Sequence, residues 1–301
     1  MTNVLFNFTD KCNLQCRHCY ASCGPKGKTM SRENIVNVLD HLPKDTETLT
    51  ISGGEPFVER ERLMQLLGYI KENKKILLPA GEIALLTNGF WIRNTGTAYH
   101  MLNEVYEQGI RTLDITSDDK FHREQWIDIK WQAGDLYIPL HKLMQKLSAE
   151  KGKRCNLIGG GMSIPYDSHG KEFRAVVPLG ANVAYPFGRG RNIQNLERRE
   201  FSQCNIRTWH RDRLSYDELT VAPDGKAYPC CWRVTPSIGS AIESPLEELV
   251  ENMPENELFA ALLEEGPEGA ARVLGIYKDK DKEIYERNPC VKCEEIFRGM
   301  R

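Results

Sequence analysis

Three cysteines near the start of the chain have the residue type and spacing that most clearly suggest chemistry. Cys12, Cys16 and Cys19 make a C-x3-C-x2-C run, and they are three of only ten cysteines in 301 residues. Clustered cysteines in a reducing compartment bind metals or act in catalysis more often than they form disulfides. Three thiolates can hold a four-iron cluster with one iron left open, or a zinc ion if Cys23 or His18 adds a fourth ligand. The spacing alone leaves both metal centres open.

A glycine pair follows the second apolar run of the chain. Residues 51–56 read Ile-Ser-Gly-Gly-Glu-Pro. Gly53 and Gly54 have no side chains, so their backbone can approach a ligand closely, although a tight turn would use the same residues. Taken alone, the pair favours the turn.

Five further cysteines lie in the last hundred residues: Cys204, Cys230, Cys231, Cys290 and Cys293. Separated cysteines with a C-x2-C pair suit a four-cysteine zinc site as well as an iron–sulfur cluster. Neighbouring residues on an extended strand point to opposite faces, so Cys230 and Cys231 are not expected to face one centre. We therefore expect Cys231 to be a free thiol, and Cys23 and Cys155 to be buried thiols without a metal.

The elements that must position these residues alternate between strands and helices over the first two thirds of the chain. Strands are expected at residues 4–8, 48–52, 83–87, 112–116, 155–158 and 174–178, with a further piece at 183–186. Apolar residues at helical spacing predict helices over 35–42, 63–70, 99–106 and 140–147, with Ser31 as a cap and Gly109 and Gly152 as stops. Such βα units predict an α/β fold with a parallel sheet, and five or six units fit an open, partial barrel.

Chemistry in parallel βα architectures lies at the C-terminal ends of the strands. The unusual residues follow those ends: Cys12 after the first strand, Gly53-Gly54 after the second, Asn88-Gly89 after the third and Ser117-Asp118 after the fourth. The sequence therefore predicts that these segments meet at one edge of the sheet.

The character of the chain changes near residue 195. Two short strands, at 219–222 and 227–230, flank the turn at residues 223–225, and short helices are expected over 245–251 and 255–263. We expect one domain at residues 1–195 and a second at 196–301.

The charge balance and hydropathy exclude some functions. Lys and Arg total 40 against 42 Asp and Glu, a net charge of −2, so no overall basic field would attract nucleic acid. No apolar run reaches the ~18–20 residues of a membrane span, and no signal peptide is recognisable. We expect a cytoplasmic protein with neither a membrane nor a nucleic-acid partner.

The two N-terminal motifs together resemble those of the radical S-adenosylmethionine (radical SAM) enzymes. The cysteine run resembles the family's cluster-binding motif, and Gly53, Gly54, Glu55 and Pro56 resemble its GGEP element. The resemblance covers about residues 1–195. It implies a partial (β/α)6 barrel and a [4Fe–4S] cluster held by the three cysteines, whose open iron would bind S-adenosylmethionine.

The resemblance also assigns cofactor contacts. The carbonyl groups of Gly53 and Gly54, or the carboxylate of Glu55, would accept hydrogen bonds from the ammonium group of S-adenosylmethionine. Ser117 and Asp118 would bind its ribose hydroxyls, since an ionised Asp only accepts hydrogen bonds. A helix cap would use the same two residues.

The C-terminal part resembles the auxiliary-cluster domain called SPASM, in its shorter twitch form. That resemblance implies a second iron–sulfur cluster on Cys204, Cys230, Cys290 and Cys293. Members of this group that modify peptides commonly carry an N-terminal recognition domain, whereas Cys12 stands close to the start of this sequence. We therefore expect a small-molecule substrate, such as a sugar or an aminocyclitol, or a peptide delivered by a separate partner.

The resemblance predicts an oxidoreductase that reductively cleaves S-adenosylmethionine, abstracts hydrogen from a substrate carbon and dehydrogenates it. A flavodoxin- or ferredoxin-type protein would donate the electron. Two alternatives within the family are a radical epimerase, in which Cys231 returns a hydrogen atom, and a peptide-modifying maturase. An alternative of another class is a non-catalytic zinc-binding interaction protein. Iron and sulfide content would separate the last from the others.

Overall fold

The computed structural model describes residues 2–93, 95–116, 137–152, 155–160, 173–178, 218–278, 289–298 and 300. The strands are β1 (Thr2–Thr9), β2 (Thr46–Gly53), β3 (Glu82–Thr87), β4 (Thr112–Ile115), β5 (Cys155–Gly160), β6 (Phe173–Pro178), β7 (Leu219–Val221), β8 (Lys226–Tyr228) and β9 (Gly239–Ser240). The α-helices are α1 (Arg32–Asp40), α2 (Arg60–Leu77), α3 (Thr95–Glu107), α5 (Tyr137–Lys151), α6 (Leu246–Glu251), α7 (Glu257–Glu265), α8 (Pro267–Val273) and α10 (Pro289–Phe297). Short 3-10 helices are η1 (Pro56–Glu59), η2 (Phe90–Arg93) and η5 (Met253–Glu255).

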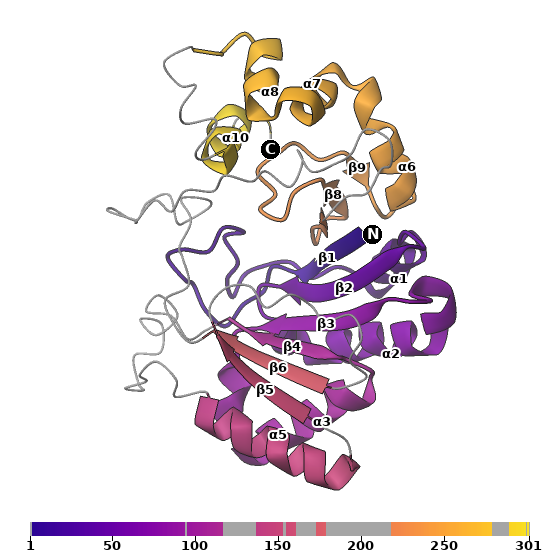
Figure 1. Cartoon of the computed structure of the whole chain (residues 1–301), viewed down its shortest axis with the longest axis vertical. Helices are drawn as coiled ribbons and strands as arrows, with labels where there is room; N and C mark the ends of the chain where they lie inside the picture. Colours follow the sequence, from indigo (N-terminus) through magenta and orange to yellow (C-terminus); the bar gives the residue numbers. More distant parts are fainter. Residues whose placement is uncertain are drawn as a thin grey trace.

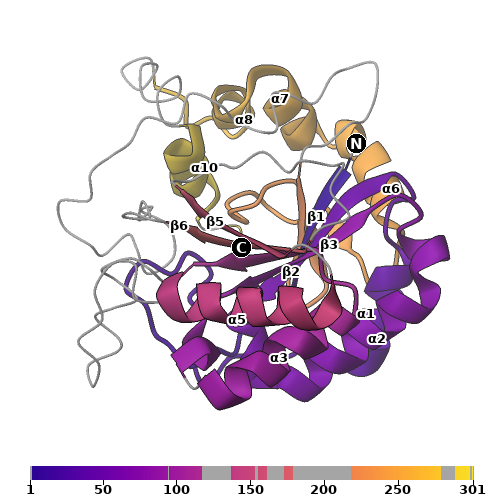
Figure 2. The same cartoon turned by 60° about the horizontal axis from the view of Figure 1, so that its bottom comes forward.

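These strands form one sheet in the order β5-β6-β4-β3-β2-β1-β7-β8-β9. β1 to β7 pair in parallel, and β8 and β9 are antiparallel additions. Helices α1, α2, α3 and α5 lie together on one side of the sheet, and α7, α8 and α10 lie on the other (Figures 1 and 2). The predicted α/β class with a mostly parallel sheet is confirmed.

The two faces of the sheet differ in polarity. Successive side chains alternate between faces, and residues in register across parallel strands share a face. One face is apolar and buried against the helices: Val4, Phe6 and Phe8 on β1, Leu49 and Ile51 on β2, Ile83 and Leu85 on β3, Leu113 and Ile115 on β4, and Leu219 and Val221 on β7. The opposite face is largely polar, with Asn7 on β1, Thr48, Thr50 and Ser52 on β2, Asp114 on β4, Arg174 on β6 and Thr220 on β7. The polar face is therefore the one away from α1, α2, α3 and α5, which is the inner side in a barrel built from βα units.

The predicted helix boundaries agree with the structure where local signals mark them. Ser31 caps α1, and its side chain accepts a hydrogen bond from the backbone of Asn34 at 3.1 Å. Gly109 and Gly152, which follow α3 and α5, have φ values of +92° and +60°, a conformation that glycine adopts without steric cost.

Strand order departs from the simple sequential series in two places, because β7 pairs with β1 and β5 does not pair with β4. β6 lies between β4 and β5 and pairs in parallel with both. β5 is therefore the strand at one edge of the sheet, although it precedes β6 in the chain. The strand piece predicted at 183–186 lies outside the described residues.

The C-terminal segment continues the sheet of the N-terminal part. β7 pairs with β1, and the turn predicted at residues 223–225 joins β7 to β8 in a hairpin. The end of α1 also contacts this segment, because the His41 ring lies 2.9 Å from the Ala241 carbonyl and the backbone of Leu246 donates to the His41 carbonyl. The boundary expected near residue 195 lies outside the described residues and stays a prediction.

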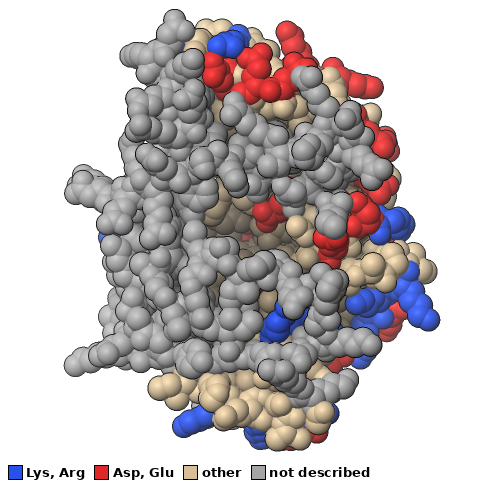
Figure 3. Space-filling model, in the orientation of Figure 1, with Lys and Arg blue, Asp and Glu red and all other residues tan. Residues whose placement is uncertain are grey.

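Acidic side chains gather over the C-terminal helices on the face seen in Figure 3. Helices α7 and α8 carry four glutamates, Glu257, Glu264, Glu265 and Glu268. Within the described ranges, no helix combines the length and the hydropathy needed to cross a bilayer.

Candidate cluster and cofactor site

The loop that carries the cysteine run begins directly after β1 and folds back on itself. The backbone of Asp10 donates to the Lys28 carbonyl at 2.7 Å, and Cys12 donates to the Gly24 carbonyl at 3.1 Å. Gly24 in turn donates to the Asp10 carbonyl at 3.1 Å. These bonds close the base of the loop, so that Cys12, Cys16 and Cys19 are held at the C-terminal end of β1.

The three thiols occupy a shared environment that suits metal-bound sulfur. Cys12 and Cys16 are buried and Cys19 is half-buried. Backbone amides donate to sulfur at two of them, from Leu14 to Cys12 at 3.4 Å and from Cys23 to Cys19 at 3.3 Å. Burial raises the pKa of Cys12 to about 12, and the nearby charges of Glu55, Cys16 and Cys19 add to the increase. A cation bound here would relieve this repulsion and hold the thiolate form.

The described residues hold no group of three or more His, Cys, Asp and Glu side chains that converge on a single metal ion. An iron–sulfur cluster distributes its cysteine ligands over separate irons, so its thiols need not converge on one point. Amide hydrogen bonds to sulfur are one of the means by which proteins tune such clusters. The loop therefore fits a cluster by its donor set and its hydrogen bonds.

Gly53 and Gly54 join the end of β2 to the base of the cysteine loop. The backbone of Gly54 donates to the Thr9 carbonyl at 2.7 Å, and Glu55 donates to the Lys11 carbonyl at 2.8 Å. A Cβ atom at Gly53 would lie 2.2 Å from the Thr9 oxygen, and one at Gly54 would lie 2.2 Å from the Lys11 oxygen. Gly53 also has φ +146°, which side chains rarely tolerate. Because Gly53 and Gly54 have no side chains, the turn can pack directly against the backbone at Thr9 and Lys11. The same property would allow a ligand to approach closely.

Glu55 connects three segments from a fully buried position. Its side chain is 0% exposed. One carboxylate oxygen accepts from the backbone of Phe57 at 3.1 Å and from the Thr87 hydroxyl at 2.8 Å, and the other accepts from the backbone of Asn88 at 2.6 Å. Pro56 begins η1, where the missing N–H costs nothing. Glu55 therefore braces the ends of β2 and β3 from within, a role that its place in the Gly-Gly-Glu-Pro sequence does not indicate.

Asn88 carries this bracing network to the cysteine loop. Its side-chain amide donates to Asn13 at 2.9 Å and lies 3.9 Å from the Cys12 sulfur. The sequence predicts that Asn88 follows a strand end, but it does not indicate these contacts. Its contacts with Glu55 and Asn13 join residues more than thirty positions apart, which sequence spacing does not reveal.

Two predicted cofactor contacts, Ser117 and Asp118, lie outside the described residues, as does Cys204. The last described residue of that segment is Thr116, whose backbone donates to the Thr87 carbonyl at 2.9 Å. These assignments stay predictions.

The strand predicted over residues 227–230 ends before it reaches Cys230. β8 ends at Tyr228, and Cys230 begins a turn in which the backbone of Arg233 donates to the Cys230 carbonyl at 3.1 Å. The rule that neighbours on a strand face opposite ways therefore does not apply to Cys230 and Cys231. The Cys231 thiol instead donates a hydrogen bond to Cys230, which lowers the pKa of Cys230 and raises that of Cys231.

Cys290 and Cys293 lie on α10, three residues apart and so on one side of that helix. Cys293 is 2% exposed, and Cys290 is half-buried. Cys290 is close enough to Cys231 to contribute to the increase in its pKa. The turn at Cys230 and the start of α10 thus lie near each other, as an auxiliary centre would require.

A charged contact links the two cysteine-bearing segments. Arg233 lies 3.8 Å from a carboxylate oxygen of Asp10 and 5.8 Å from the ring centroid of Tyr20. Tyr20 packs edge-on against Trp232 at 5.2 Å. Burial raises the pKa of Asp10, and the Arg233 charge opposes that increase. Asp10, which precedes the three N-terminal cysteines, and Tyr20, which follows them, therefore contact the turn that contains Cys230.

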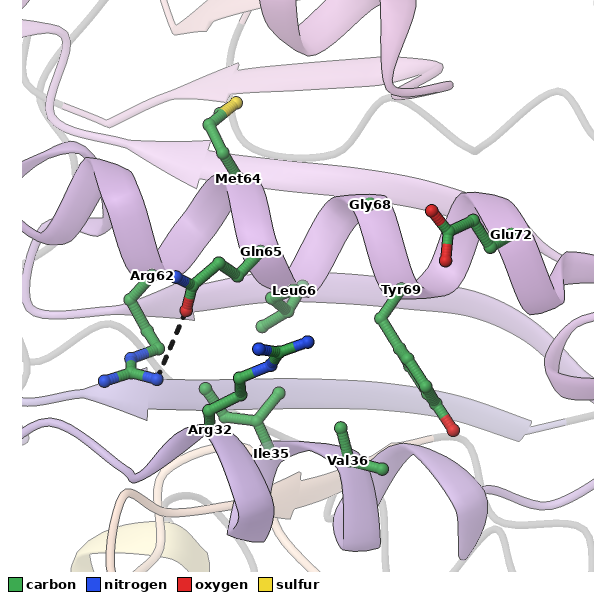
Figure 4. A pocket seen from close by; sticks show the side chains of 10 residues that line it. All are labelled: Arg32, Ile35, Val36, Arg62, Met64, Gln65, Leu66, Gly68, Tyr69 and Glu72. Atoms are coloured by element: carbon green, nitrogen blue, oxygen red, sulfur yellow. Dashed lines mark hydrogen bonds between the residues drawn. The ribbon is translucent and has the colours of Figure 1, made fainter.

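A separate hollow of about 240 Å³ lies between α1 and α2 (Figure 4). Arg32, Arg62, Met64 and Tyr69 are among the residues that line it. Both helices cover the apolar face of the sheet, so this hollow lies on the outer side of the barrel, away from the polar inner face. It is not part of the candidate site.

Comparison with known proteins supports the N-terminal assignment. Residues 6–119 match the family model described as the Radical SAM superfamily. This range includes the cysteine run, the Gly-Gly-Glu-Pro turn and Asn88.

Two curated relatives each align with part of the chain. The Bacillus subtilis (strain 168) protein YydG, named for peptide biosynthesis, is 27% identical over 119 residues, which cover 38% of this chain and 35% of YydG. The S-adenosylmethionine-dependent nucleotide dehydratase of Fibrobacter sp. (strain UWH6) is 24% identical over 153 residues, which cover 48% of this chain and 41% of the relative. The chain thus spans less than half of the length of these relatives.

A solved structure shares the fold over most of the chain. The crystal structure of BtrN in complex with AdoMet and 2-DOIA superposes with a TM-score of 0.54 at 15% identity and covers 92% of this chain and 91% of BtrN. At this identity the likeness establishes the partial-barrel fold alone.

Proposed function

We propose that this chain is a radical SAM enzyme that abstracts a hydrogen atom from a carbon of a small, hydroxyl-bearing substrate and dehydrogenates it. The observation that carries the proposal is the physical connection between the two motifs. Gly54 and Glu55 are bonded to the backbone at the base of the cysteine loop, and Glu55 reaches the same loop again through Asn88. The three cysteines and the Gly-Gly-Glu-Pro turn thus form one rigid edge at the ends of β1, β2 and β3.

Cys12, Cys16 and Cys19 would hold a [4Fe–4S] cluster, with the open iron available to S-adenosylmethionine. The carbonyl groups of Gly53 and Gly54 are the proposed acceptors for its ammonium group. When bound, the first cluster would supply the electron that cleaves S-adenosylmethionine to methionine and a 5′-deoxyadenosyl radical, and an auxiliary cluster would take up the second electron of a dehydrogenation. The protein's own share is to position the reactants and exclude water.

For the auxiliary cluster we propose Cys204, Cys230, Cys290 and Cys293 as ligands. The closeness of Cys231 to both Cys230 and Cys290 supports a centre in this region. It also makes Cys231 an alternative ligand in place of a free thiol. Single Cys→Ala variants at Cys230 and Cys231 separate the two assignments, since only loss of a ligand removes the auxiliary iron.

The fold shared with BtrN supports a small-molecule substrate, because that structure was solved with AdoMet and 2-DOIA. The relation to YydG supports the alternative, a peptide substrate. Hydroxyl and amide groups on β1, β2 and β7, at Asn7, Thr50, Ser52 and Thr220, favour the small molecule, because neutral polar side chains match a polyhydroxylated compound. A flavodoxin- or ferredoxin-type protein remains the expected electron donor.

Metal content is the first test. Anaerobically reconstituted protein should hold about eight irons in two four-iron clusters. The triple change of Cys12, Cys16 and Cys19 to Ala should leave about four irons, and Cys155→Ala, outside both proposed ligand sets, should leave all of them. A colourless protein with two tightly bound zinc ions would establish the zinc-binding alternative instead.

Cofactor cleavage is the second test. With a strong reductant the wild-type protein should convert S-adenosylmethionine to 5′-deoxyadenosine, and Cys16→Ala should abolish this conversion. Formation of S-adenosylhomocysteine as the main product would indicate methyl transfer and would refute hydrogen abstraction.

Turnover in deuterated water distinguishes the two redox outcomes. Dehydrogenation yields a product two hydrogens lighter, and Cys231→Ala should then stay active if Cys231 holds no iron. Epimerisation yields a product of unchanged mass apart from one solvent deuterium, and Cys231→Ala should lose it. The second result would show that Cys231 is a hydrogen donor.

A further inference from the structure

Asn7 is a buried amide on the inner face of the sheet that has no partner in the described part of the chain. Its side chain is 1% exposed, and neither its amide nitrogen nor its amide oxygen has a hydrogen-bond partner. Buried polar groups in native proteins are almost always hydrogen-bonded, because each unpaired donor or acceptor carries a desolvation cost. An amide left unpaired in the free protein therefore points to a group that binds there.

The position of Asn7 places it at the proposed site. It lies two residues before the end of β1 and five residues before Cys12. It is in register with Ser52, the residue before Gly53, and Ser52 is 4% exposed. Asn7 and Ser52 thus share the inner face at the level where β1 and β2 lead into the cysteine loop and the Gly-Gly-Glu-Pro turn.

A second unpaired group lies on the neighbouring strand. Thr220 on β7 is 0% exposed, and its hydroxyl has no hydrogen-bond partner among the described residues. Thr220 is in register with Leu5, which lies two residues before Asn7 on β1. Side chains two residues apart on a strand share a face, so Thr220 lies on the same face as Asn7. The Asn7 amide and the Thr220 hydroxyl therefore lie close together on one face, across the paired strands β1 and β7.

The chemistry of the patch defines what it can bind. A carboxamide offers two donors and one acceptor, and a hydroxyl offers one donor and accepts as well. Asn7, Ser52 and Thr220 carry no formal charge. Such a neutral set matches hydroxyl groups, which donate and accept in turn, better than it matches a carboxylate or a phosphate.

We propose that Asn7, with Ser52 and Thr220, forms a subsite that binds a ligand hydroxyl in the barrel interior. The hydroxyl could come from the ribose of S-adenosylmethionine or from the substrate. The choice of these two sources rests on the proposed function. Asn7 is then a binding residue, and its amide is paired only when the ligand is present.

The test compares Asn7→Leu and Thr220→Val with Asn3→Leu in the reconstituted protein. Asn3→Leu is the matched control. Asn3 lies on the same strand and the same face, but it is half-exposed and lies near the start of β1, away from the cysteine loop. Without ligand, Asn7→Leu should leave the melting temperature unchanged or raise it by about 2–4 °C, since an apolar group of similar shape replaces unpaired polar atoms. A fall of several degrees would overturn the proposal, because it would mean that Asn7 bonds protein or fixed water in the free state.

Binding is then measured by calorimetry with two probes, S-adenosylmethionine and myo-inositol. Loss of at least about tenfold in affinity for S-adenosylmethionine alone in Asn7→Leu assigns the subsite to the ribose. The same loss for myo-inositol alone assigns it to the substrate. Unchanged affinity of Asn7→Leu for both probes, or no binding of either by the wild type, overturns the subsite.

The outcome is separable from that of the proposed function. A protein that holds no iron and does not cleave S-adenosylmethionine, yet loses myo-inositol binding in Asn7→Leu, retains the subsite and loses the radical assignment. A protein that produces 5′-deoxyadenosine with unchanged affinities in Asn7→Leu retains the function and loses the subsite.

Discussion

Replacement of Glu55 by Gln should destabilise the protein although it barely changes the size of the side chain. The Glu55 carboxylate accepts three hydrogen bonds, from Phe57, Thr87 and Asn88, in a position that is 0% exposed. Glutamine has one oxygen and one NH2 group in place of the two oxygens. With its oxygen toward Phe57 and Thr87, its NH2 group would face the Asn88 backbone N–H, and two donors cannot bond.

The size of this effect follows from the bond that is lost. Hydrogen bonds to charged acceptors contribute about 1.5–3 kcal/mol, and a buried donor left unpaired costs about 1–3 kcal/mol. We expect Glu55→Gln to lower the free energy of unfolding by about 2–4 kcal/mol. The loosened Asn88 should also weaken its contacts with Asn13 and Cys12, so the loop should retain less iron.

Urea unfolding of the cluster-free protein measures the first effect, and iron content after gel filtration measures the second. Glu59→Gln is the matched control, because Glu59 carries the same change four residues on and pairs with Lys11 at a partly exposed site. That variant should change stability by less than about 1 kcal/mol. Glu55→Gln within the range of the control would refute the bracing role. A destabilised variant with full iron content would refute the link from Glu55 to the cysteine loop.

Three further changes test other contacts. Gly54→Ala should cost about 2–3 kcal/mol by urea unfolding, because its Cβ would overlap a backbone carbonyl, whereas Gly68→Ala, with open space around its Cβ, should stabilise α2 by about 0.5–1 kcal/mol. The hydrogen bond to Asp40 raises the pKa of Tyr69 to about 12, so its contribution to stability is present below about pH 10 and is lost between pH 10 and 12. Asp40→Asn should return that pKa toward 10 in a carbon-13 NMR titration of the tyrosine rings. Arg233→Met should cost about 1–2 kcal/mol by urea unfolding, because it leaves a half-buried carboxylate without its cation, and an unchanged midpoint would contradict the contact between the two cysteine segments.

Local signals in the sequence were sufficient for much of the barrel. Alternating apolar residues placed β1 to β4, and the cap at Ser31 and the glycines after α3 and α5 placed helix ends. The spacing of Cys12, Cys16 and Cys19, together with Gly-Gly-Glu-Pro, predicted a radical SAM segment that the family comparison supports. These features depend on neighbours within a few residues, so they are visible in the sequence.

Tertiary pairing decided the rest, because it joins residues far apart in the chain. The insertion of β6 between β4 and β5 and the addition of β7 to β1 depend on which strand edges meet. The bracing role of Glu55 arises only when the end of β3 reaches the end of β2, and the turn at Cys230 replaces the expected strand once β8 ends. Asn7 follows the same rule. Its residue type and its strand were visible in the sequence, but an amide becomes unpaired only when folding removes water from it and supplies no partner.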